Sequence, residues 1–315
     1  MHPAASVIIF TVISGLGYGL IITLSLAELF ALAPLSGFDI AFGLTLALCL
    51  VAGGLLSSLF HLGHPERAWR ALSQWRSSWL SREGVAAILS MLPPMGIIFV
   101  ALFPENFAIP SFLIHILFAL SGVLALVTIF STAMIYRSLR TIDAWFNNWV
   151  PIGFLVLALA GGSLLATAII FSTHGEAGSL PLLSLIFVGL SMTVKISYWQ
   201  NINRRPSVSS IETALGVQNT REVKQFVPPH SGENYLMQEM GFRIARKHAA
   251  KLRKLCVVLG FVGSLVLLLP VLFEFNGVAT ASLWLAVIAM VFGLFIERWL
   301  FFAEAKHTVG LYYGR

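Results

Sequence analysis

Residues 61–84 read HLGHPERAWRALSQWRSSWLSREG, the densest polar stretch in the first half of a very apolar chain. One long apolar run ends at His61, and the next run begins at Glu83. If the two runs form neighbouring antiparallel helices, this stretch joins their ends at one face of a membrane. The sequence therefore predicts a histidine and a carboxylate at the same depth.

The composition is that of an integral membrane protein. Of the 315 residues, 57% are hydrophobic and 11% are charged, whereas soluble domains are about 25% charged. A bilayer core about 30 Å thick needs roughly 20 apolar residues in a helix. Eight runs meet this requirement: 5–33, 39–62, 84–103, 110–136, 150–173, 178–200, 249–272 and 278–303. We predict an all-α polytopic membrane protein, a single integral membrane domain over 1–315 with eight transmembrane helices in an up-and-down bundle.

The charges are segregated between the two ends of this bundle. With eight spans, both termini share one side with the connections 63–82, 137–149 and 201–248. All 20 Lys and Arg residues lie on that side or at its boundary. The opposite connections hold no Lys or Arg, and their charged residues are Asp39, Glu105, Glu176 and Glu274. The positive-inside rule predicts that both termini are cytoplasmic.

The sequence offers little to hold a metal. The two cysteines, Cys49 and Cys256, both lie in apolar runs, and an iron–sulfur site needs about four thiolates. No zinc-ligand spacing and no phosphate-binding glycine loop occur. His115 and His174, near the outer ends of two spans, could in principle meet at a haem. We disfavour haem and predict no metal site in this chain.

The pair His61 and Glu83 fits the chemistry of a quinone, which exchanges two electrons and two protons. A neutral imidazole can hydrogen-bond a quinone oxygen and exchange a proton near pH 7. A carboxylate can relay that proton to water, and ionisable groups at membrane depth indicate function. The structural alternative is a helix C-terminal cap for His61 and a favourable first-turn acid for Glu83.

The connection between these two residues is basic and aromatic. Its cations are interleaved with tryptophans, and part of the segment has helical spacing. One interpretation is an interfacial amphipathic helix with an aromatic belt. The other is a docking surface for an electron-transfer partner, with Arg67 also at the rim of the quinone pocket. The docking candidates are Arg67, Trp69, Arg70, Arg76 and Arg82. Nucleic-acid binding is excluded because the segment is short and held at a membrane.

The connection 201–248 is the only sizeable segment outside the membrane. Two compatible interpretations are a lipid-headgroup anchor and a docking surface for a cytoplasmic partner. Its stretch 235–244 looks helical. Within the spans, we expect Lys195 to extend its ammonium group to the cytoplasmic boundary, and Glu297–Arg298 to form a local pair. The glycines at 15–19 and 161–162 favour close helix packing.

Several of these residues also carry a family resemblance. The sequence resembles the membrane-anchor subunit family of dimethyl sulfoxide reductase. The matching positions are His61-Leu62-Gly63, Pro65, Arg67-Ala68, Leu72, Ser78, Leu80-Ser81, Glu83, Met134-Ile135-Tyr136, the opening 1–11 and the stretch 234–246. The resemblance implies a quinone-site histidine at His61, an important glutamate at Glu83, and quinone (ubiquinone or menaquinone) as the redox partner in this chain.

The resemblance further implies a three-subunit complex in the bacterial inner membrane. Its other members are a ferredoxin-like four-cluster iron–sulfur subunit and a catalytic subunit with a molybdenum bis-pyranopterin (molybdopterin) cofactor. The predicted cytoplasmic face favours the branch of membrane-bound sulfite dehydrogenase. The alternative is a quinol-oxidising anchor of a dimethyl sulfoxide, N-oxide or polysulfide reductase, with reversed electron flow. A transporter and a passive structural anchor are the alternatives from other classes.

Overall fold

The computed structural model describes residues 5–60, 62–106, 109–204, 210–216, 223, 226–227 and 246–313. Within these ranges the regular structure is helical, and eight helices are long and apolar enough to cross a membrane. The prediction of an all-α protein with eight spans is thus confirmed. The helices are α1 (Ala5–Leu29), α2 (Gly37–Leu59), α3 (Trp79–Leu102), α4 (Ser111–Arg137), α5 (Trp149–His174), α6 (Leu180–Arg204), α10 to α11 (Ala249–Leu255, the π-helix Cys256–Val262 and Gly263–Leu272), and α12 (Asn276–Ala303).

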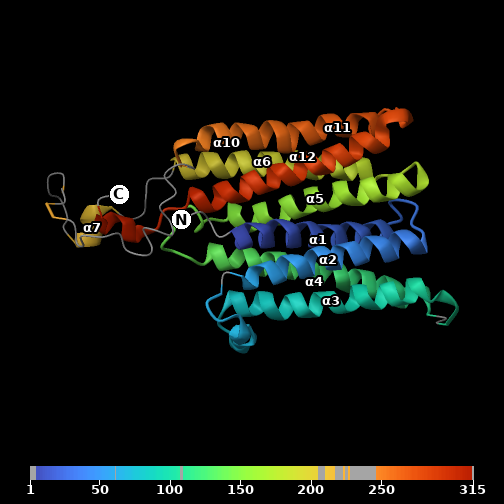
Figure 1. The fold of residues 1–315 in the computed structure, drawn as a ribbon, viewed down its shortest axis with the longest axis horizontal. Coiled ribbons are helices and arrows are strands. Elements are labelled where there is room, and N and C mark those ends of the chain that lie inside the picture. Colours follow the sequence, from blue (N-terminus) through green and yellow to red (C-terminus); the bar gives the residue numbers. More distant parts are fainter. Residues whose placement is uncertain are drawn as a thin grey trace.

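Successive helices run antiparallel to one another along the long axis of the molecule (Figure 1). The start of α1, the end of α12, the short helix α7 (Ile211–Leu215) and the 3₁₀ helix η1 (Pro65–Gln74) all lie at one end, which we call the loop end. The tight connections between successive pairs of helices lie at the opposite end, which we call the hairpin end.

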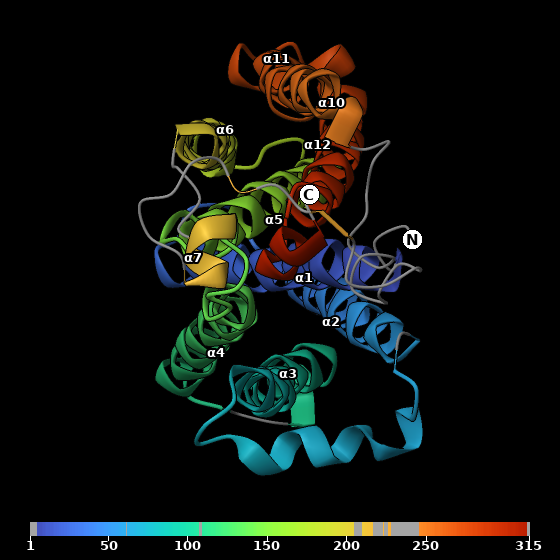
Figure 2. The ribbon, with the colours of Figure 1, turned by 90° about the vertical axis from the view of Figure 1, so that its left-hand side faces the viewer.

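The bundle consists of two halves that are each contiguous in sequence. In the first half α1, α2, α3 and α4 pack in a ring, so that α4 returns to α1; in the second half α5, α6, α10–α11 and α12 do the same. The halves meet mainly through α1 and α5, which lie at the centre when the molecule is viewed from its loop end (Figure 2).

Two glycines make this central contact possible. A Cβ atom on Gly162 of α5 would overlap the backbone of Gly19 in α1, and a Cβ on Gly19 would overlap the carbonyl group of Ala158. Backbones approach this closely in membranes only where side chains are absent. The predicted packing role of these glycines is therefore confirmed at Gly19 and Gly162.

The helix α3 begins at Trp79, before the predicted start at residue 84. Ser81, in the first turn of α3, holds η1 against the loop end of this helix. The Ser81 hydroxyl donates to the carbonyl of Ala71 and accepts from the amide of Gln74 at 3.2 Å. The early start places Glu83 a full turn inside the helix. The predicted amphipathic segment forms a 3₁₀ helix, and it has no buried residue.

At the hairpin end an ion pair joins α2 to α5. Asp39 completes a capping box with Ser36 at the start of α2, and its Oδ2 lies 2.6 Å from Nε2 of His174 at the end of α5. His115, the other histidine considered for a haem, is exposed on α4. The structure thus gives His174 a carboxylate partner. The expected helix at 235–244 lies outside the described residues.

Candidate functional site

Glu83 is buried inside the first half of the bundle, near the loop end. Its side chain is about 5% exposed, and Oε1 accepts a hydrogen bond of 2.5 Å from the hydroxyl of Thr132 on α4. The Thr132 hydroxyl also lies 3.0 Å from the carbonyl oxygen of Thr128 in its own helix. A buried carboxylate needs such partners because removing it from water is costly.

The local sequences explain this placement. Along α3, small and polar residues recur every three or four positions on the face that holds Glu83, so this face turns inward. The facing stripe of α4 is also small or hydroxylated. Its buried members are Ser121, Gly122, Ala125, Thr128, Ser131 and Thr132. The hydroxyls first bond to their own helix backbone, and Thr132 alone among them reaches a carboxylate in the described structure.

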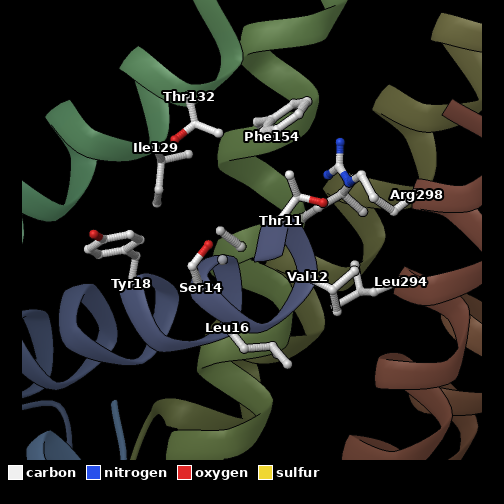
Figure 3. A pocket seen from close by; sticks show the side chains of 13 residues that line it. Thr11, Val12, Ser14, Leu16, Tyr18, Ile129, Thr132, Phe154, Leu294 and Arg298 are labelled. Carbon is white, nitrogen blue, oxygen red and sulfur yellow. The ribbon is translucent and has the colours of Figure 1, made fainter. Parts of the chain in front are cut away.

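An interior cavity lies beside Glu83, where α1, α4, α5 and α12 meet. Thr132 and Tyr18 line one side and Arg298 lines the other, with Thr11 and Ser14 between them (Figure 3). The volume of this cavity is about 30 Å³, which is enough for one or two water molecules. It can therefore hold water, and it is far too small for a quinone ring.

The Tyr18 hydroxyl at this cavity is buried next to Ser90 and Thr128. It makes no hydrogen bond of normal geometry with the described residues. Buried hydroxyl groups in proteins nearly always have a partner. The adjoining cavity leaves room for a water molecule to complete the hydrogen bonding of this hydroxyl.

A buried ionic cluster lies in the second half, at a similar distance from the loop end. Lys195 of α6 forms an ion pair with Oε1 of Glu297 in α12, and Oε2 of Glu297 lies 3.5 Å from Nε of Arg298. All three side chains are at most 5% exposed. The prediction that Lys195 extends to the boundary was wrong: its ammonium group points inward because a carboxylate on a distant helix compensates its charge.

Aromatic rings complete the surroundings of the two cations. The Lys195 ammonium lies 4.1 Å from the ring centre of Tyr198, and the Arg298 guanidinium lies 3.9 Å from that of Phe154. Cations bind favourably over the faces of such rings. Even so, the Arg298 Nε atom is buried without a hydrogen-bond partner in the described structure.

The other site candidates lie at the loop end. His61 is outside the described residues; it follows the end of α2 at Leu59, between the exposed Phe60 and Leu62. Arg67 is exposed, with its Nε atom 3.7 Å from the Glu66 carboxylate. The structure therefore brings Glu83 to Thr132, while Arg67 extends towards solvent.

The basic and aromatic residues of η1 and the following turn form an exposed surface, which we call the basic loop surface. Trp69 and Trp75 are 67% and 53% exposed, and the guanidinium groups of Arg70 and Arg76 lie 5.7 and 5.4 Å from their ring centres. Arg82 differs. Its guanidinium donates to the carbonyl oxygens of Trp75 and Arg76 and lies 4.3 Å from the Trp79 ring centre. It therefore stabilises the turn that carries the basic loop surface.

Comparison with known proteins identifies the family. The DMSO reductase anchor subunit (DmsC) family matches residues 1–314. This chain belongs to that family. The anchor subunit is 33% identical to the C subunit of sulfite dehydrogenase from Allochromatium vinosum over an alignment of 334 positions, which covers 99% of both proteins.

Two further relatives are from Escherichia coli (strain K12). The C chain of anaerobic dimethyl sulfoxide reductase is 27% identical over 53% of the anchor subunit and 58% of its own length. The YnfH chain of anaerobic dimethyl sulfoxide reductase is 23% identical over 66% and 72%. The anchor subunit is thus a multi-pass membrane protein whose relatives are named as subunits of oxidoreductases, and the family resemblance is confirmed.

The sequence analysis missed Thr132 and Tyr18 and considered Arg298 only as part of a local pair. These three residues meet at the cavity because α1, α4 and α12 are neighbours in the fold. A signal for Thr132 did exist, because hydroxyl residues recur along α4 with helical spacing. Within the described ranges, no group of three or more His, Cys, Asp and Glu side chains is arranged to hold a metal ion.

Proposed function

We propose that the anchor subunit is the quinone-reactive membrane subunit of a molybdenum and iron–sulfur sulfite dehydrogenase. Electrons from sulfite pass through an iron–sulfur subunit, docked on the basic loop surface, to a quinone near His61 and Glu83. The observation that carries this proposal is the buried Glu83 carboxylate, held by Thr132 close to that surface. Ionisable groups at membrane depth are rare unless they have a function.

The reaction defines what Glu83 has to do. Sulfite and water give sulfate, two protons and two electrons, and quinone takes up two electrons and two protons to become quinol. Protonated Glu83 donates a proton to a quinone oxygen, and the resulting carboxylate is stabilised by the hydrogen bond from Thr132. His61, which follows α2 directly, is the second proton-exchanging group. The position of the quinone itself is part of the proposal.

The basic loop surface suits an acidic protein partner. Its arginines and tryptophans are exposed, and both residue types are enriched where proteins bind one another. Their positive charge attracts an acidic surface and orients its approach. We place this surface, both termini and the partner subunits on the cytoplasmic face of the bacterial inner membrane, following the positive-inside rule.

Similarity supports the sulfite branch. The sulfite dehydrogenase relative aligns with the whole protein, whereas the C chain of dimethyl sulfoxide reductase aligns with about half of it. The family description and both E. coli relatives favour a second candidate, a quinol-oxidising anchor of a reductase. The residues then act in reverse: the Glu83 carboxylate accepts a proton from quinol.

The test uses membranes that contain the anchor subunit with its native partner subunits. Sulfite-driven reduction of a ubiquinone analogue is measured for wild type, Glu83→Gln and His61→Ala. We expect each variant to lose turnover by about 100-fold, the usual scale of general acid–base catalysis. Thr132→Val should lose less. Thr193→Val is the matched control, because the Thr193 hydroxyl is exposed on α6 and bonds only to its own helix in the described structure.

Three results separate the alternatives. Loss of quinone reduction in both variants of an intact complex supports the proposal. If sulfite is inert but a quinol drives reduction of a sulfoxide or polysulfide, the second candidate is correct. If an assembled complex of the Glu83→Gln variant turns over like wild type, Glu83 has no part in proton exchange.

A further inference from the structure

Buried polar atoms without a hydrogen-bond partner gather at three cavities that lead from the region of Glu83 to the loop end. The described residues contain seven such side-chain atoms, and five of them belong to residues that line these cavities. These five are Tyr18 Oη, Asn201 Oδ1, Glu297 Oε2, Arg298 Nε and Glu304 Oε2, and among them Glu297 Oε2 and Arg298 Nε lie 3.5 Å apart as an ion pair. Native proteins rarely leave such atoms unsatisfied, and buried water is the usual partner.

The first two of these cavities adjoin each other. The cavity beside Glu83 shares its wall residues Phe154, Leu157 and Arg298 with a second cavity, whose polar lining includes Lys195 and Glu297. This second cavity has a volume of about 10 Å³, close to the limit for a single water molecule.

A third and larger cavity, of about 920 Å³, opens at the loop end. It shares Trp149 with the second cavity and is lined by Asn201, Arg253 and Glu304. Three cavities in series therefore lead from the loop-end surface to Thr132, whose hydroxyl donates to Glu83.

Charged side chains line this route. Lys195, Glu297 and Arg298 together carry one net positive charge. Arg298 lines both the first and the second cavity, and it lies across the first cavity from Thr132, whose hydroxyl donates to Glu83. Water in the first cavity would therefore lie between a buried cation and the hydroxyl group that holds Glu83.

We propose that water in these three cavities forms a proton route from the loop-end surface at Asn201 and Glu304 to Glu83. The inference rests on the proposed function, in which Glu83 exchanges protons with quinone. After Glu83 has donated a proton to a quinone oxygen, a proton from the loop-end surface passes along the water molecules and restores the carboxyl group. This transfer accounts for one of the two protons that quinone takes up with the two electrons from the iron–sulfur partner, and His61 exchanges the other.

The hydration of the route is tested without turnover. Brief X-ray radiolysis produces hydroxyl radicals from bound water, and mass spectrometry then measures oxidation of buried rings in the intact complex in membranes. We expect oxidation of Tyr198 and Phe154, which line the route. Phe118 and Phe261, which are also buried but do not line these cavities, should stay unmodified. If Tyr198 and Phe154 are as unreactive as these controls, the route is dry and the inference is wrong.

The proton role is tested by blocking the first cavity. A Cβ on Gly15 would meet only the Cβ of Ala158, at 4.0 Å, so Gly15→Val adds methyl groups to the cavity without backbone overlap. Tyr18→Phe removes only the orphaned hydroxyl. The matched control is Thr23→Val on the same helix, because the Thr23 hydroxyl bonds to its own backbone away from the route.

Blocking the route should slow quinone reduction by about tenfold or more and increase the solvent deuterium isotope effect. The KM for the quinone analogue and reduction of the iron–sulfur clusters by sulfite should not change. Turnover of Gly15→Val within twofold of Thr23→Val would overturn the proton role. If the wild-type complex reduces no quinone, the proposed function fails, and the radiolysis result alone then supports the route or rejects it.

Discussion

The buried ionic cluster predicts an unusual order of variant stabilities. Lys195, Glu297 and Arg298 together carry one net positive charge. The variant Lys195→Met leaves a neutral Glu297–Arg298 pair. The variant Glu297→Gln instead leaves two cations without a compensating charge. We expect the loss of the carboxylate to be the more damaging change, although both variants break the same ion pair.

The magnitudes follow from the distances. At 3.5 Å and an effective dielectric constant of about 20, opposite charges attract by about 5 kcal/mol, before the cost of desolvation. Breaking a buried pair by removing one partner destabilises proteins by about 3–5 kcal/mol. We assign this full range to Glu297→Gln and about 1–2 kcal/mol to Lys195→Met, because Arg298 still compensates the carboxylate. The double variant removes one uncompensated cation and should be more stable than Glu297→Gln alone.

The assay uses the buried thiol of Cys256, one of only two cysteines in the protein. In a Cys49→Ala background, a thiol-reactive fluorophore labels Cys256 when the purified complex unfolds in increasing SDS, and the labelled subunit is separated afterwards. Glu28→Gln, a half-buried carboxylate on α1, controls for loss of a carboxylate as such. A double variant less stable than Glu297→Gln would refute the charge-compensation argument.

Three further predictions concern packing, the hairpin end and docking. Gly162→Val should prevent accumulation of the folded protein in membranes, because any Cβ there overlaps α1, whereas Gly189→Val, with free space around it, should accumulate normally in immunoblots. Asp39→Ala should lower the free energy of unfolding by about 2–4 kcal/mol, because it removes a helix cap and a charged hydrogen bond. His174→Ala should lower it less, because the cap persists. Labelling of Cys256 measures both variants. Reversing the charge of Arg67, Arg70 and Arg76 together should release the iron–sulfur partner from membranes in sedimentation assays. Full retention of the partner would contradict the docking role.

Sequence reasoning was successful where the relevant information is local. Run lengths of apolar residues predict membrane spans because the bilayer thickness sets the length of a helix. Glu83 was singled out for the same reason, as a carboxylate at the start of an apolar run, and its role stays a prediction. Lys195 was misplaced because depth alone favours an outward-pointing side chain, and its partner Glu297 belongs to a helix far along the sequence. The partners of Glu83 depend likewise on which helices become neighbours, which a local pattern does not determine.

The division into two contiguous halves also bears on how the protein is made. All residues of the ring of α1 to α4 are synthesised before those of α5, so its internal contacts can form while later parts of the protein are still being made. Until α5 arrives, however, the face of α1 that carries Gly19 must lie against lipid. Of the residues in an 18-residue apolar window of α5, 94% are buried in the finished protein. This helix therefore gains most of its contacts only once both halves surround it. The insertion of α5 is thus the step that joins the two halves.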